Sequence, residues 1–196
     1  MTLLLFFVNF AFANIEFDPL RDDLTMPANC VHLTAEDFSE PHTKVIYGIE
    51  GYKAKGFTDE IPLERQEARG LWQAMNGDRI SLGVVNSDPE LRRFKKILDT
   101  RGVEMGFDFG KEGDILEVFA LVDLEVRYPN SEYFRTGGYE YSDGRGSVVG
   151  ELDVLVGRRS DCNIIVIGEA KLGYKMIGKA REQLSRFENY YRQRAP

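Results

Sequence analysis

The second half of the 196-residue chain carries an order of elements that few folds can accommodate. Residues 114–128 have apolar side chains at helical spacing, but their even positions are also apolar, as a strand would require. The length of this segment and the Pro129 that follows it favour a helix. Three strands separated by short polar turns are predicted next, at residues 132–141, 147–156 and 164–171. An amphipathic helix over 176–192 completes the series, which indicates an α/β fold with helices packed against a sheet.

The first half of the chain is organised differently. Apolar spacing predicts two strands and one helix there, at residues 43–49, 79–85 and 61–75 respectively. A further helix is predicted to start at Asp88, which can cap it, with Pro89 as its first residue. The glycine-containing segment 107–113 is predicted to be an internal boundary. The chain would then consist of an N-terminal α/β extension of uncertain role, residues 14–106, and a core of residues 107–196.

The N-terminus resembles an export signal. Residues 3–13 read LLLFFVNFAFA and end in Ala-Phe-Ala, which is typical of a signal peptide and its cleavage site, although no basic residue precedes the apolar run. Residues 1–13 are therefore predicted to be a leader, and the mature protein to be secreted or periplasmic and not held in a membrane. The alternative is a cytoplasmic protein in which this segment packs into the core. Cys30 and Cys162 would form one bridge in an exported protein and be small buried apolar residues in a cytoplasmic one.

Charge is distributed unevenly along the chain. The formal net charge is −7, yet residues 171–196 contain seven basic and only two acidic side chains. The acidic total excludes a protein coated throughout in basic residues, whereas the basic C-terminal segment indicates local contact with an anionic partner. Candidate phosphate contacts in the last helix and just before it are Lys175, Lys179 and Arg186; the alternative is that they form a solvated helix face.

Acidic side chains are predicted to converge on neighbouring strands. Strand alternation places Glu151 and Asp153 on one face, opposite Leu152 and Val154, and it places Glu169 and Lys171 together on the next strand. Converging carboxylates repel one another unless a hard cation lies between them, and Mg²⁺ prefers such oxygen ligands. An adjacent ammonium group can offset the negative charge that develops during phosphodiester hydrolysis. A cross-strand ion pair on a solvated sheet face is the simpler alternative.

These residues resemble the D…(D/E)-x-K signature of the PD-(D/E)XK, restriction-endonuclease-like nucleases. Asp153 is followed, after fifteen residues, by Glu169-Ala170-Lys171. The resemblance implies a restriction-endonuclease-like αβββα core with a mixed central sheet. It also implies that Asp153, Glu169 and the carbonyl of Ala170 bind the metal, and that Lys171 positions the attacking water.

Two further segments are similar to the same family. Glu117 matches the acidic residue of the family's first helix, which can serve as an additional metal ligand; a surface residue is the alternative. Gln183, followed four residues later by Phe187, resembles the Q-x-x-x-Y helix of the RecB-like branch, with Phe in place of Tyr, and would help to hold the nucleic-acid strand; a helix-surface amide is the alternative. Glu151 is assigned to support a ligand and not to bind metal itself. The chain departs from the family in having Leu152 where Pro is common. It also ends soon after the last helix, so the family's final core strand would be absent or supplied from elsewhere.

The sequence therefore predicts a nuclease that depends on Mg²⁺, with Mn²⁺ as a substitute, and that hydrolyses nucleic acid, with DNA favoured over RNA. One alternative is a non-catalytic nucleic-acid-binding or interaction module that retains the fold. Another is an unrelated secreted α/β binding protein whose acidic face holds a structural ion. The missing core strand would leave a sheet edge open to pairing with a second copy of the chain, a homo-oligomer.

Overall fold

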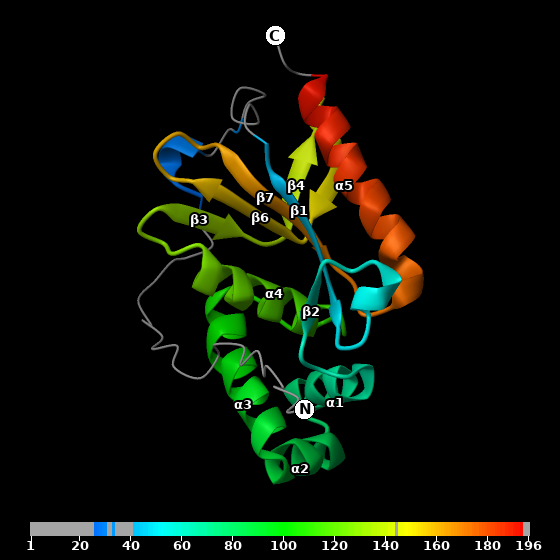
Figure 1. Ribbon diagram of the computed structural model, residues 1–196. Coiled ribbons are helices and arrows are strands. Elements are labelled where there is room, and N and C mark those ends of the chain that lie inside the picture. The colour runs from blue at the N-terminus through cyan, green and yellow to red at the C-terminus, as the bar shows by residue number, and fades with distance from the viewer. Residues whose placement is uncertain (1–25, 31–32, 34–40, 144, 194–196) are drawn as a thin grey trace, which may run out of the picture.

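The computed structural model describes residues 26–30, 33, 41–143 and 145–193. The predicted leader, residues 1–13, lies outside these ranges. Five strands form one mixed sheet in the order β2-β1-β7-β6-β3 (Figure 1). Their bounds are β1 (Thr43–Ile49), β2 (Asp59–Ile61), β3 (Tyr133–Thr136), β6 (Val154–Arg158) and β7 (Ile164–Ala170). β1 runs parallel to both β2 and β7, whereas β6 runs antiparallel to β7 and β3. The expected mixed α/β class is thus confirmed.

One helix covers each face of this sheet. α4 (Asp114–Arg127) packs on one face and α5 (Ile177–Arg192) on the other (Figure 1). The prediction of a helix in the ambiguous segment 114–128 is confirmed, and the apolar even positions reflect a helix that is buried on most sides. The predicted apolar stripe of the last helix is confirmed as well, because its buried residues are Ala180, Leu184, Phe187 and Tyr191.

Three shorter helices gather beside α4 at one end of the molecule (Figure 1). They are α1 (Arg65–Met75), α2 (Arg79–Ser87) and α3 (Pro89–Ile97), followed by a π-helical turn over Leu98–Gly102. The start of α3 is as predicted, since the Asp88 carboxylate accepts hydrogen bonds from the backbone N–H groups of Glu90 and Leu91. The strand predicted at 79–85 is wrong. Asp78 caps a helix there by accepting a hydrogen bond from the N–H of Ser81.

Two predicted strands are each broken in two. A separate ribbon of β4 (Tyr139–Ser142) and β5 (Val148–Leu152) leaves the main sheet. The glycines at 137–138 separate β3 from β4, and Gly138 adopts a φ of +58° that favours glycine. Asp153 separates β5 from β6. The prediction that Leu152 and Val154 share a face is therefore wrong: Leu152 packs in the apolar cluster under α5, and Val154 packs in the cluster around α4.

The strand next to β7 in the main sheet comes from the N-terminal half of the chain. β1 pairs in parallel along β7, with Ile46 opposite Glu169 and Tyr47 opposite Ala170. β1 therefore covers this edge of β7. It follows that the N-terminal half shares its sheet with the C-terminal half. None of the helices in the described ranges has the length and hydropathy needed to cross a membrane.

A disulfide joins Cys30 to Cys162, with the two Cα atoms 5.4 Å apart. Of the two alternatives for these cysteines, the structure therefore contains the bridge. It ties the 3₁₀ turn at Ala28–Cys30 to the loop between β6 and β7.

We expect replacement of both cysteines by serine to lower the free energy of unfolding by about 2–4 kcal/mol. The bridge closes a loop with a sequence separation of 132 residues, and long loops restrict the unfolded chain strongly. Urea unfolding of the oxidised protein and of the double variant measures the difference. Superimposable unfolding curves would show that the bridge does not contribute to stability.

Candidate active site

Asp153 lies at the junction between β5 and β6, beside the end of β7. The backbone bends at Asp153, so Leu152 packs in the apolar cluster under α5 and Val154 packs in the cluster around α4. The Asp153 carboxylate is almost buried, and its Oδ2 accepts a hydrogen bond of 2.7 Å from the backbone N–H of Ala170. This bond fixes the carboxylate against the end of β7.

Lys171 bridges two carboxylates. Its Nζ lies 2.6 Å from Asp153 Oδ2 and 2.6 Å from Glu169 Oε2. The backbone N–H of Lys171 donates to the carbonyl of Tyr47 in β1, which continues the strand pairing past the end of β7. Burial alone would lower the pKa of Lys171, but the two carboxylates outweigh this effect and raise it. The side chain is therefore an ammonium ion at neutral pH.

Glu169 is a fully buried carboxyl group, with 0% of its surface exposed. Burial, and then the charge of Asp153, raise its pKa to about 8, although Lys171 opposes both effects. A hydrogen bond with the Asp153 side chain also favours the protonated form of Glu169 and raises its pKa. No N–H or O–H group of the described residues donates to its Oε1.

Glu117 approaches the same group from α4. Burial raises its pKa to about 8, and the nearby charges of Asp153 and Asp114 add to the effect. Lys171 opposes the shift, which places Glu117 within electrostatic range of both Asp153 and Lys171. The structure thus gathers Glu117, Asp153, Glu169 and Lys171 at one end of the sheet, between α4 and α5.

Other predicted residues lie at the margin of this group or away from it. Glu151 is exposed on β5, opposite Glu140. Its charge makes the smallest of the contributions to the raised pKa of Glu117. Gln183 lies on α5, and no hydrogen bond or ion pair in the described ranges joins it to Asp153 or Glu169. Its Oε1 is buried there without a hydrogen-bond partner.

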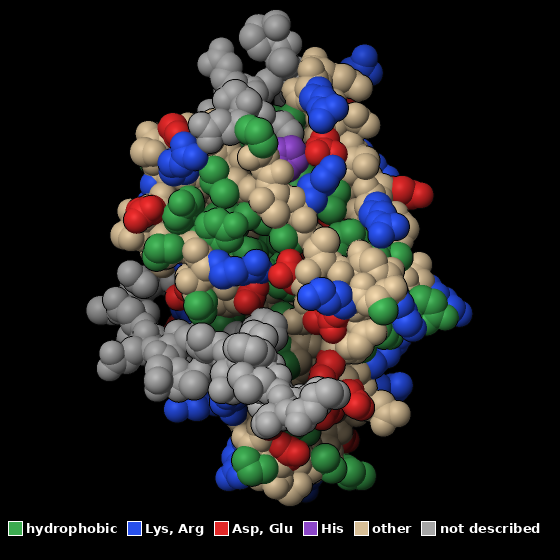
Figure 2. Space-filling view, in the orientation of Figure 1, with side chains coloured by type: hydrophobic (Ala, Val, Ile, Leu, Met, Phe, Trp, Pro, Cys, Tyr) green, Lys and Arg blue, Asp and Glu red, His purple; other side chains and the backbone are tan. Residues whose placement is uncertain are grey.

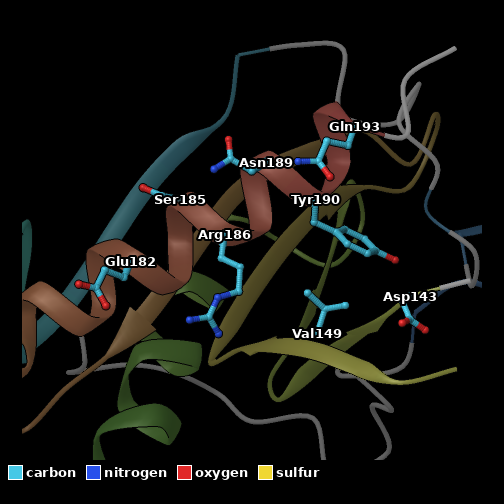
Figure 3. A pocket seen from close by; sticks show the side chains of 8 residues that line it. All are labelled: Asp143, Val149, Glu182, Ser185, Arg186, Asn189, Tyr190 and Gln193. Atoms are coloured by element: carbon cyan, nitrogen blue, oxygen red, sulfur yellow. The ribbon is translucent and has the colours of Figure 1, made fainter. Parts of the chain in front are cut away.

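The basic residues of the C-terminal segment separate into different surfaces. Figure 2 shows Lys and Arg side chains spread along the side of the molecule that α5 occupies. Lys175 lines the cleft described next, whereas Lys179 is exposed on α5 outside it. Arg186 lies in a second groove, where it and Tyr190 extend from α5 toward the β4–β5 ribbon (Figure 3). That groove also contains two carboxylates, from Asp143 and Glu182, so its charge is mixed.

A cleft of about 620 Å³ reaches the carboxylate group at Glu117 and Lys171, while Asp153 and Glu169 lie behind its lining. Its lining includes Glu117, Ala170 and Lys171, together with residues that the sequence did not indicate: Tyr52, Arg65 and Lys111. These three come from the N-terminal half and from the segment before α4. No motif marks them, because only the pairing of β1 with β7 brings the N-terminal half to this end of the sheet.

The donor atoms of the site suit a hard divalent cation. Asp153, Glu169 and Glu117 offer carboxylate oxygens, the ligands that Mg²⁺ and Mn²⁺ prefer, and the buried Oε1 of Glu169 accepts no hydrogen bond from the described residues. Within the described ranges, no three His, Cys, Asp or Glu side chains are close enough together to form a metal site. Lys171 explains this spacing in part, because its ammonium group contacts both Asp153 and Glu169 and supplies the positive charge between them.

Comparisons of the chain with protein-family models, with curated proteins and with solved structures found no match. The similarity to the PD-(D/E)XK nucleases therefore depends on Asp153, the Glu169-Ala170-Lys171 segment and the order of elements around them.

Proposed function

We propose that the protein is a metal-dependent nuclease with a restriction-endonuclease-like core built from α4, β3, β6, β7 and α5. The observation that carries this proposal is the position of Lys171 Nζ, 2.6 Å from a carboxylate oxygen of both Asp153 and Glu169. The strand β1, parallel to β7, takes the place of the family's final core strand.

Each residue of the site then has a chemical task. Asp153, Glu169 and the carbonyl of Ala170 would hold Mg²⁺, or Mn²⁺ as a substitute, with Glu117 as an additional ligand from α4. The metal, when bound, supplies polarisation of the phosphate and a lower pKa for water. Lys171 orients the attacking water and offsets negative charge in the transition state.

The unfavourable free energy of ionising the buried carboxyl groups supports a functional role. Burial raises the pKa of Glu169 and of Glu117 to about 8 in each case, which means that ionising either carboxyl group is unfavourable in this environment. Perturbed carboxyl groups in a cleft are characteristic of functional sites. A simple surface ion pair would not need a fully buried glutamate.

Cleavage of nucleic acid tests the proposal. The purified full chain should cleave plasmid DNA in Mg²⁺ or Mn²⁺, and excess EDTA should abolish the reaction. Oligonucleotides of DNA and RNA in the same assay compare the two polymers, with DNA expected to be cut faster. Failure to cut any of them in either metal would contradict the proposal and favour a non-catalytic binding module.

Export is a separate proposal. A disulfide is typical of proteins in oxidising compartments, and the sequence of residues 3–13 resembles a leader. We expect the mature protein in its native host to begin at Asn14 and to be secreted or periplasmic. N-terminal sequencing tests this, and recovery of an intact Met1 from the cytosol would refute it.

A further inference from the structure

The cleft above Lys171 has a rim that is basic and aromatic. Arg65, Lys111 and Lys175 are exposed cationic side chains from three separate segments, and all line the cleft. None of the three side chains forms an ion pair or hydrogen bond within the described part of the chain. Their charge is therefore available to an anion that approaches the site.

Two tyrosines stand at the same rim. The rings of Tyr52 and Tyr174 meet edge to face, with centroids 6.1 Å apart and planes at 88°. Tyr52 also packs on the buried Phe57, with ring centroids 5.5 Å apart, which holds it in place. Lys55 Nζ lies 4.0 Å from the centroid of Tyr174, yet 45% of the Tyr174 surface stays exposed. The rim thus presents one partly exposed ring, Tyr174, which contacts Lys55 and the Tyr52 ring that Phe57 supports.

We propose that this rim binds single-stranded nucleic acid and directs it to Lys171. Unpaired bases expose flat faces that stack on tyrosine rings, whereas the bases of a duplex are already stacked on one another. Arg65, Lys111 and Lys175 line the same cleft as Tyr174 and would contact phosphates of the bound strand. The cleft volume of about 620 Å³ is in the range that encloses a small molecule, a size that fits one nucleotide unit.

This inference rests on the proposed function, because it takes the bound strand to be the substrate of the carboxylate group. It also gives the N-terminal half of the chain a role. Tyr52 and Arg65 come from that half and form one side of the rim, while Tyr174 and Lys175 form the other. The pairing of β1 with β7 brings the two sides together.

Binding measured without a metal tests the inference independently of cleavage. Fluorescence anisotropy in EDTA compares a labelled single-stranded DNA, a single-stranded RNA of the same sequence and the matching DNA duplex. We expect at least one of the single strands to bind roughly ten-fold more tightly than the duplex, as expected from base stacking on an exposed ring.

Variants locate the contact. Tyr174→Ala should weaken single-strand binding roughly ten-fold, whereas Tyr174→Phe should keep it, because the ring does the stacking. Arg65→Ala combined with Lys111→Ala should also make the salt dependence shallower, by about 1.4 in the logarithmic slope for two lost phosphate contacts. Arg69→Ala is the matched control, since Arg69 is exposed on α1 one turn beyond Arg65 and does not line the cleft.

The outcomes separate the two proposals. Equal or tighter binding of the duplex, or unchanged binding by Tyr174→Ala, would overturn the single-strand inference even if the protein cleaves DNA. Tyr174-dependent binding of a single strand without cleavage in any metal would contradict the nuclease proposal and support the rim as a binding surface.

Discussion

Glu169→Gln is expected to abolish metal-dependent cleavage without unfolding the protein. The substitution keeps the shape of the side chain but removes a ligand charge, so the single-turnover rate should fall on the order of 10²–10³-fold. Stability should be unchanged or higher, because the native carboxyl group is fully buried and its Oε1 accepts no hydrogen bond in the described ranges. Loss of cleavage without loss of stability would identify Glu169 as a functional residue, because replacing a structural residue lowers stability.

Single-turnover cleavage and urea unfolding of the same preparation measure the two effects. Glu182→Gln is the matched control, because Glu182 is exposed on α5 and does not line the candidate cleft. Cleavage at the wild-type rate by Glu169→Gln would remove Glu169 from the metal site. A large loss of stability would show that the ion pair with Lys171 is mainly structural.

Lys171→Met should remove turnover while metal binding persists. The substitution removes no metal ligand. It does remove the group that orients the water and offsets negative charge, and the loss of such a group lowers the rate on the order of 10²–10³-fold. Lys171→Arg should fail too, since a planar guanidinium does not replace a compact ammonium group.

The apo form of Lys171→Met should also be destabilised, because the Asp153 carboxylate loses its cation and the buried Glu169 carboxyl group loses the ammonium that contacts it. We expect a loss of about 2–3 kcal/mol, less than for a fully buried pair, since the side chains of Lys171 and Asp153 remain 15% and 12% exposed. Mn²⁺ should restore part of this stability by binding only the folded chain.

Thermal unfolding in EDTA and in Mn²⁺, with single-turnover cleavage, tests both parts of this prediction. Lys96→Met, an exposed position on α3, is the control. Normal cleavage by Lys171→Met would contradict the nuclease assignment, and failure of Mn²⁺ to stabilise the variant would contradict the metal site.

Sequence periodicity was sufficient where one pattern was strong. The buried stripe of α5 repeats at helical spacing from Ala180 to Tyr191, and the helix forms there. The segment 79–85 misled because Ile80, Leu82 and Val84 alternate with other residues as in a strand. In the structure Ile80 is 80% exposed, so the alternation does not mark a buried strand face. A helix forms instead because Asp78 caps it and because α2 packs on α1 and α3.

The site was predictable only in its local part. Asp153, Glu169 and Lys171 could be placed together from strand spacing, and the structure does bring them into contact. The cleft around them could not, because Tyr52 and Arg65 reach it through pairing between strands more than a hundred residues apart in the chain. Such long-range pairing leaves no periodic signal in a single sequence.

The position of the metal tests the central claim most directly. Fe²⁺ in place of Mg²⁺, with ascorbate and peroxide, generates radicals that cut the backbone next to a bound metal, and mass spectrometry locates the cuts. We predict cuts beside Asp153 and within 169–171, suppressed by excess Mg²⁺ and absent in Asp153→Asn. Cuts confined to other segments, or cuts at these positions that Mg²⁺ does not suppress, would contradict a metal site formed by Asp153 and Glu169.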